Sequence, residues 1–241
     1  MARCIKVHDL GLTDYRDALD TQRELQAARI AGEALDTLLL TEHRPVLTLG
    51  RAHPAPDLRV PAGAVQDAGI EIVATERGGD ITYHGPGQLV AYGIVDLRGW
   101  DLPLLDYVAG LEQTVIRLLA RRGIEANQRH GARGVWVEGR KIASVGIHVR
   151  RWVTMHGIAL NLAPDMAHFE LINPCGLAGI EMTSMERELG TSPPMTEVKA
   201  AFVDAFAEVF RCESVGSPVH VTTRPSSPAP SSAMQEKGGT L

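Results

Sequence analysis

Residues 134–162 contain three apolar segments that are separated by turns of only a few residues. GVWV and KIASVGIHV flank the turn EGR, and the triplet RRW separates the second segment from VTMHGIALNL. Turns this short join antiparallel neighbours, because parallel strands need a crossover of a dozen or more residues. We therefore expect an antiparallel meander whose second strand begins at Lys141.

Apolar periodicity in the rest of the chain predicts both helices and further strands. In chain order we expect a helix over 13–40, strands over 45–50, 70–74 and 88–97, and helices over 104–122 and 197–211. Thr13 and Thr196 are candidate caps for the first and last helices, and Gly123 is placed to end the second.

The length of 241 residues and the hydrophobic content of 44% predict one compact domain, which we assign to residues 1–216. Residues 217–241 consist mostly of Ser, Pro, Thr, Ala and Gly, with hardly any large apolar side chain. Such a segment cannot bury enough surface to order itself. We expect it to be a disordered tail.

Composition argues against several classes of function. The formal net charge of −5 disfavours nucleic acid as a partner, and no apolar run is long enough to span a bilayer. The N-terminus resembles no secretory signal, so we expect a cytoplasmic protein without a membrane partner. The three cysteines lie far apart, and neither they nor the nine histidines show the paired spacing of a metal site.

The segment RGGDITYHGPGQ, residues 77–88, holds four glycines together with polar side chains. A tight turn between two strands would explain the glycines alone. The polar residues among them suggest instead the wall of a pocket, because glycine lets backbone N–H groups approach a ligand closely. The pattern matches neither a P-loop nor a dinucleotide fingerprint, so a nucleotide phosphate is not the expected ligand.

Two further segments carry chemistry-bearing residues. LINPCGL places Cys175 between a proline and a glycine, which would leave a thiol accessible, although a loop cysteine without an activating partner is usually inert. Lys141 opens an otherwise apolar strand, where a solvated lysine beside a turn is the simplest interpretation. Small residues follow along the meander, and they would leave room for a long, thin ligand: Ser144, Gly146, Gly157 and Ala159.

Together, RGGDITYHGPGQLVAYGIVDL, GRKIASVGIHVRRWVTMHGIALNL and INPCGL resemble the three signatures of the octanoyltransferases of lipoate biosynthesis. These enzymes move an octanoyl group from acyl carrier protein to a lysine of lipoyl domains. The resemblance extends from about residue 5 to about residue 211. It implies an α+β fold like that of lipoate and biotin protein ligases, with a mixed, largely antiparallel sheet packed against helices.

The resemblance also implies roles. Cys175 corresponds to the nucleophile that carries the acyl group as a thioester, and Lys141 to the residue that lowers the pKa of its thiol. The implied acceptors are lipoyl domains of 2-oxoacid dehydrogenase E2 subunits and the glycine cleavage H protein, and no cofactor or metal is implied. The implied substrate-binding residues are Arg77, Gly78, Gly79, Asp80, Ile81, Thr82, Tyr83, His84, Ser144, Val145, Gly146, Gly157, Ile158 and Ala159.

Two alternatives remain at this stage. An ATP-dependent lipoate-protein ligase shares the fold but activates a free acid and needs no cysteine nucleophile. A non-catalytic protein that binds lipoyl domains or acyl carrier protein would keep the glycines without needing Cys175 or Lys141. The joint presence of these two residues favours the transferase.

Overall fold

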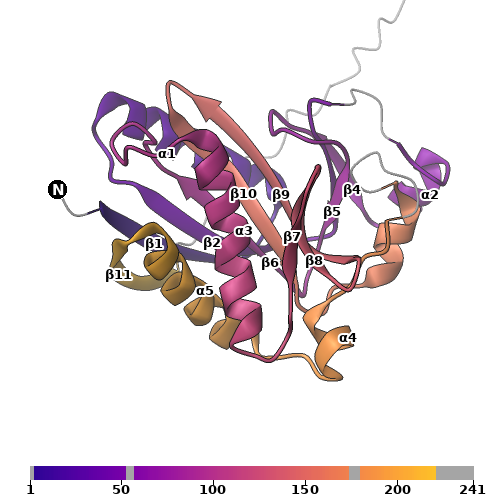
Figure 1. The fold of residues 1–241 in the computed structure, drawn as a ribbon. Helices are drawn as coiled ribbons and strands as arrows, with labels where there is room; N and C mark the ends of the chain where they lie inside the picture. The colour runs from indigo at the N-terminus through magenta and orange to yellow at the C-terminus, as the bar shows by residue number, and fades with distance from the viewer. Residues whose placement is uncertain (1–2, 53–56, 174–179, 221–241) are drawn as a thin grey trace, which may run out of the picture.

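The computed structural model describes residues 3–52, 57–173 and 180–220, and of residues 216–220 only the backbone. Within these residues a large sheet of eight strands runs in the order β11-β1-β2-β6-β10-β9-β8-β7 (Figure 1). Its strands are β1 (Arg3–Thr13), β2 (Thr37–His43), β6 (Gln88–Ile94), β7 (Asn127–Arg129), β8 (Ala132–Val137), β9 (Arg140–Arg150), β10 (Val153–Asn161) and β11 (Cys212–His220).

Most neighbours in this sheet are antiparallel. Only β1 pairs in parallel, with β2 on one side and β11 on the other. A second, smaller sheet in the described residues has the order β4-β3-β5. It consists of β3 (Val46–Leu49), β4 (Glu71–Ala74) and β5 (Thr82–His84). The expectation of an α+β fold with a mixed, largely antiparallel sheet is confirmed.

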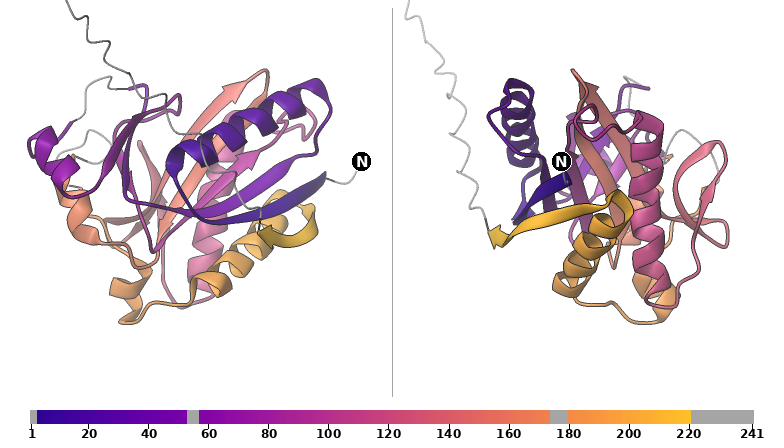
Figure 2. Two further views of the ribbon diagram at one scale, coloured as in Figure 1. Left: turned by 180° about the vertical axis from the view of Figure 1, so that it is seen from behind. Right: turned by 60° about the vertical axis from the view of Figure 1, so that its left-hand side comes forward.

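Helices cover both faces of the large sheet. α3 (Leu104–Ala120) and α5 (Met195–Phe210) lie side by side on one face, and α1 (Tyr15–Ala31) lies on the other (Figures 1 and 2). Three shorter elements lie towards the small sheet and the end of the large one: α2 (Ala62–Asp67), the 3₁₀ helix η1 (Met166–Leu171) and α4 (Met185–Leu189).

Burial on both faces explains the unbroken apolar runs of the central strands. In β2, Leu38 and Leu40 belong to the core beneath α3 and α5, whereas Leu39 belongs to the core beneath α1. Successive side chains of a strand point to opposite faces, so a strand covered on both sides needs apolar residues at every position. The hydrophobic effect thus holds three layers together around one sheet.

The predicted meander is confirmed as β8, β9 and β10. Glu138 and Gly139 form the first turn with φ of 48° and 86°, and Arg151 and Trp152 form the second with φ of 48° and 69°. Positive φ at both central residues is the geometry that matches the right-handed twist of paired strands.

The helix predicted over 13–40 is wrong in its second half. α1 ends at Ala31, where Gly32 adopts the left-handed conformation with φ of 78° and stops the helix. Leu39 lies in β2, so its helix-compatible spacing arose by coincidence between two elements. The predicted caps are also wrong, because Asp14 precedes α1 and Pro194 precedes α5, with Thr196 inside that helix.

The sequence did not predict β11 and β1, the two strands at one edge of the large sheet. β1 alternates polar and apolar residues only weakly, and β11 extends to His220, beyond the residue at which the tail was expected to begin. Residues 221–241 lie outside the described residues.

A cluster of buried aromatic and imidazole rings joins α1, the large sheet and the small sheet. The ring centroid of His43 lies 5.2 Å from that of Tyr15, 5.9 Å from that of His84 and 5.8 Å from that of Tyr92. His156 of β10 extends the cluster, with its centroid 6.2 Å from that of Tyr92. The three histidines are at most 6% exposed.

Burial keeps these histidines neutral. Loss of hydration lowers the pKa of His43 to about 3, with a further contribution from His84. Burial likewise lowers the pKa of His84 to about 4 and that of His156 to about 3. In the unfolded chain each histidine regains an ordinary pKa and takes up a proton below about pH 6.5. The unfolding free energy is therefore not reduced by these histidines above about pH 6.5, and it falls as the pH drops towards 4.

We predict that His43→Gln reduces the acid sensitivity of folding. Each such histidine makes the unfolding free energy about 2 kcal/mol smaller at pH 5 than at pH 7. Urea unfolding at both pH values should show that loss shrinking by about this amount in His43→Gln, and remaining unchanged in His130→Gln, which alters an exposed histidine. An identical pH dependence in wild type and His43→Gln would contradict the neutral buried state.

Candidate active site

The loop from Thr75 to Ile81 lies across the end of β3 and against β9. Gly78 N–H donates to the carbonyl of Ile147 at 2.9 Å, and Ala52 N–H donates to that of Gly79 at 3.1 Å. The first bond attaches the loop to β9 of the large sheet, and the second attaches it to the residues that follow β3 of the small sheet. The first part of the glycine-rich segment therefore has a defined course over the meander.

The guanidinium of Arg77 is buried beneath this loop. It donates from Nε to Thr48 Oγ1 at 3.2 Å, from Nη2 to the Thr48 carbonyl at 2.5 Å and from Nη1 to the Gly78 carbonyl at 3.1 Å. A buried cation is costly unless fixed polar atoms replace its water. Thr48 supplies two such atoms, so the charge is held in one place by the backbone and side chain of β3.

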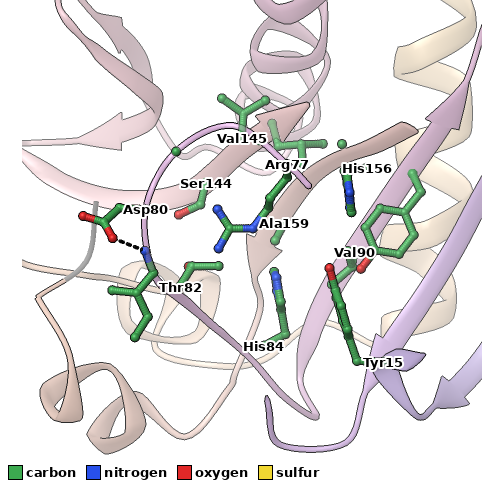
Figure 3. A pocket seen from close by; sticks show the side chains of 16 residues that line it. Tyr15, Arg77, Asp80, Thr82, His84, Val90, Ser144, Val145, His156 and Ala159 are labelled. Atoms are coloured by element: carbon green, nitrogen blue, oxygen red, sulfur yellow. Dashed lines mark hydrogen bonds between the residues drawn. The ribbon is translucent and has the colours of Figure 1, made fainter. Parts of the chain in front are cut away.

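An inner pocket opens between the loop, β5, β6 and the meander (Figure 3). Most of the predicted substrate-binding residues line it, and the Arg77 guanidinium lies among Thr82, Ser144 and Ala159 in Figure 3. The full lining comprises Tyr15, Arg77, Gly79, Asp80, Ile81, Thr82, His84, Val90, Tyr92, Ser144, Val145, Gly146, His156, Gly157, Ile158 and Ala159.

Two predicted residues are not in this lining. Tyr83 faces the opposite side of β5 from Thr82 and His84, because side chains alternate along a strand. Its hydroxyl is 2.8 Å from His168 Nδ1, and its ring packs against Phe169. Gly78 lines the neighbouring outer cleft instead.

A chain of side-chain amides fixes the tautomer of His84. Asn161 Nδ2 donates to the Thr183 carbonyl at 2.9 Å, so Asn161 Oδ1 accepts from Gln88 Nε2, also at 2.9 Å. Gln88 Oε1 then faces His84 Nδ1 at 2.6 Å and must accept its proton. Neutral His84 thus carries its hydrogen on Nδ1, which leaves Nε2 as an acceptor.

A close backbone approach requires glycine at position 157, and a less severe one favours it at position 146. A Cβ on Gly157 would lie 1.9 Å from the Ala91 carbonyl oxygen, and one on Gly146 would lie 3.1 Å from that of Gly78. From the sequence, both glycines were predicted to leave space for a ligand. In the structure they first let β10 approach β6 and let the Arg77 loop approach β9.

An outer cleft adjoins the inner pocket and shares Gly79, Asp80, Val145 and Gly146 with it. Lys141 lies in this cleft at 3% exposure, so the interpretation of a solvated lysine beside a turn is wrong. Its backbone N–H donates to the Glu181 carbonyl at 2.8 Å. The remaining lining is Arg51, Ala52, Gly78, Leu104, Leu105, Val108, Gly131, Ala132, Arg133, Trp136, Ile147 and Val149.

Several lining residues were not found from sequence. Tyr15, Val90, Tyr92 and His156 come from elements whose apolar patterns suggested only core packing. His156 has φ of 61°, unusual for a residue in a strand, and its neighbour Gly157 in the segment MHG was the only local signal. Trp136 belongs to GVWV, which was interpreted as a strand without a further role.

Cys175 lies in residues 174–179, outside the described residues. Among the residues that the structure does describe, no cluster of three or more His, Cys, Asp or Glu side chains is arranged to hold a metal ion. No helix in the described ranges is long and apolar enough to cross a membrane.

Comparison with solved structures supports the assignment of the fold. Lipoate-protein ligase A bound with ATP superimposes with a TM-score of 0.68 at 13% identity, covering 91% of this chain and 90% of that one. The bi-partite lipoate protein ligase of Thermoplasma acidophilum gives a TM-score of 0.66 at 14% identity, with coverage of 91% and 88%. At such low identity the likeness concerns the fold alone.

Sequence comparison is more specific. Residues 14–207 match the family model of the lipoyl protein ligase A/B catalytic domain. The octanoyltransferase of Solibacter usitatus is 46% identical over 207 residues, covering 86% of this chain and 93% of that protein. The octanoyltransferase of Syntrophobacter fumaroxidans is 48% identical over 202 residues, with coverage of 84% and 89%. The chain therefore belongs to the lipoyl protein ligase A/B catalytic domain family, and within it to the octanoyltransferases, which are acyltransferases.

Proposed function

We propose that this chain transfers an octanoyl group from octanoyl-acyl carrier protein to a specific lysine of lipoyl domains, through a thioester on Cys175. The proposed acceptors are the lipoyl domains of 2-oxoacid dehydrogenase E2 subunits and the glycine cleavage H protein, and the reaction takes place in the cytoplasm. The observation that carries the proposal is Lys141, buried in a cleft that continues into a partly apolar inner pocket.

The inner pocket is proposed to hold the acyl chain. Ile81, Val90, Val145, Ile158 and Ala159 give it apolar surface. Burial of each methylene contributes about 0.8 kcal/mol, so an eight-carbon chain gains several kcal/mol before any polar contact is made. The histidines add no charge at neutral pH, because their pKa values are lowered to about 3 and 4.

In the first proposed step, the Cys175 thiolate attacks the carbonyl carbon of the donor thioester. The bond to the sulfur of the carrier breaks, and that sulfur leaves as a thiol after it takes a proton from the Lys141 ammonium, which leaves Lys141 neutral. The Lys141 ammonium would favour the thiolate, because a neighbouring cation can lower a thiol pKa from about 8.5 by a unit or more. Gly79 is the better candidate oxyanion donor in the Arg77 loop, since Gly78 N–H already donates to Ile147.

In the second proposed step, the amine of the acceptor lysine attacks the acyl-enzyme, and the Cys175 thiolate leaves. The amine loses a proton, which neutral Lys141 would accept. The ammonium form is thereby restored beside the thiolate, ready for the next donor. The carbonyl of Glu181 accepts from the Lys141 N–H, and Glu181 follows Cys175 in the sequence by only a few positions. This short separation supports the proposed pairing of Cys175 with Lys141.

Two alternative functions, an ATP-dependent ligase and a non-catalytic binding protein, fit these observations less well. A ligase that activates a free acid with ATP has the same fold, but such ligases resemble this chain at 13–14% identity, against 46–48% for the octanoyltransferases. A protein that only bound lipoyl domains or acyl carrier protein would have no use for a buried lysine in the cleft. Lys141 is buried in the lining of the cleft, where it can act on a group bound there, so its presence favours catalysis.

We predict transfer without ATP. The purified protein, mixed with octanoyl-acyl carrier protein and a lipoyl domain, should add one octanoyl group to the domain, as measured by intact mass. Free octanoate with ATP and Mg²⁺ should give no product, and Cys175→Ala should abolish transfer. Transfer that requires free octanoate and ATP would establish a ligase, and binding of both proteins without transfer would establish the non-catalytic alternative.

We predict that Ser144→Leu shifts the preference for acyl length. The larger side chain would enter the inner pocket at the Ser144 position and displace about two methylenes, at a cost of about 1.6 kcal/mol or roughly 15-fold in kcat/KM for octanoyl. Butanoyl transfer should change little. Ser192→Leu, the same substitution at an exposed position, is the control. An equal loss for both donors in a folded Ser144→Leu variant would show that this wall does not measure the chain.

A further inference from the structure

Trp136 lies directly against Lys141. The two residues face each other across the β8–β9 pair, next to an irregularity in its register. Lys141 Nζ is 5.4 Å from the centroid of the indole ring, within the range of a cation–π interaction. Trp136 is 4% exposed and Lys141 is 3% exposed, and both line the outer cleft. The proposed function uses Lys141 but assigns nothing to Trp136.

Other contacts hold the indole in place. Trp136 Nε1 donates to the Ala132 carbonyl at 3.0 Å, so the polar edge of the ring is satisfied within its own strand. The guanidinium of Arg129 also lies over the ring, 5.2 Å from its centroid. A ring constrained by a hydrogen bond and a second cation has little freedom to turn away from Lys141.

The absence of a side chain at Gly134 makes room for the aliphatic stem of Lys141. A Cβ on Gly134 would lie 2.5 Å from Lys141 Cε and 2.4 Å from the Ala143 carbonyl oxygen. Gly134 N–H donates to Glu112 Oε1 at 2.7 Å, and Glu112 is itself 2% exposed on α3. The buried carboxylate therefore anchors the strand at the point where Lys141 passes it.

The indole can stabilise the buried ammonium electrostatically. An ammonium is strongly hydrated, and burial removes that water. The negative face of an indole attracts a cation and contributes most where water is excluded. An aliphatic side chain of similar size would fill the space without attracting the charge.

We propose that Trp136 is a positioning residue for Lys141, and that its indole face holds the ammonium in the cleft where acyl transfer occurs. This inference rests on the proposed function for its catalytic consequence, but the contact between the two side chains stands independently. Trp136 acts through Lys141 and forms no bond to the acyl group.

The test is a set of substitutions at Trp136 measured with and without Lys141. Trp136→Leu should lower the single-turnover rate of transfer about tenfold, and Trp136→Phe should retain most of it. In the Lys141→Met background, which keeps the apolar stem, Trp136→Leu should cause no further loss. Trp152→Leu is the matched control, because Trp152 also contacts a cation, Arg98 at 5.0 Å, but does not line the cleft, and it should leave the rate unchanged.

NMR provides a readout that does not depend on activity. The ring current of Trp136 should shift the Lys141 ε-methylene protons, and this shift should vanish in Trp136→Leu and persist in Trp152→Leu. An absent shift, an equal loss for Phe and Leu, or the same loss with Lys141 replaced would each overturn the inference. If Lys141→Met alone transfers normally, the proposed function loses its lysine, and the NMR shift then decides the contact by itself.

Discussion

The pairing of β9 with β10 is the constraint on which the site depends. Their register sets Ser144 opposite Ala159, Val145 opposite Ile158 and Gly146 opposite Gly157. A slip of one residue would turn every one of these side chains to the other face of the sheet. The same strand β9 carries Lys141 a few residues earlier, so one register places both the pocket wall and the cleft lysine.

The charges of the site are managed by fixed neighbours. Arg77 is bound by Thr48 of β3, and Lys141 lies over the face of Trp136. The buried histidines remain neutral because burial lowers their pKa values. Arg77 and Lys141 are thus held by fixed neighbours in a lining that is mostly apolar or neutral, with Asp80, Arg51 and Arg133 as its other charged residues. A fixed cation in such surroundings suits the proposed transfer, in which an anion forms beside an uncharged acyl chain.

Local sequence was enough to predict the meander, because short turns leave antiparallel pairing as the only connection, and its signature residues then identified much of the pocket wall. The contributions of Tyr15 and Tyr92 could not be predicted, since they depend on α1 and β6 meeting at the pocket. Tyr83 was expected in the wall through the family resemblance, whereas it lies in a strand of three residues that was not predicted and in which alternation turns its side chain away. Leu39 fitted a helical spacing, and only Gly32 indicated that the helix ends earlier.

The proposed mechanism depends on Cys175 carrying the acyl group. To test this role, the protein is mixed with octanoyl-acyl carrier protein in the absence of acceptor, and the product is analysed by intact mass and peptide mapping. We predict the addition of one octanoyl group, labile to hydroxylamine, mapped to Cys175 and discharged when a lipoyl domain is added. An adduct on Cys4 or Cys212, or rapid transfer with no adduct at any stage, would contradict this role of Cys175.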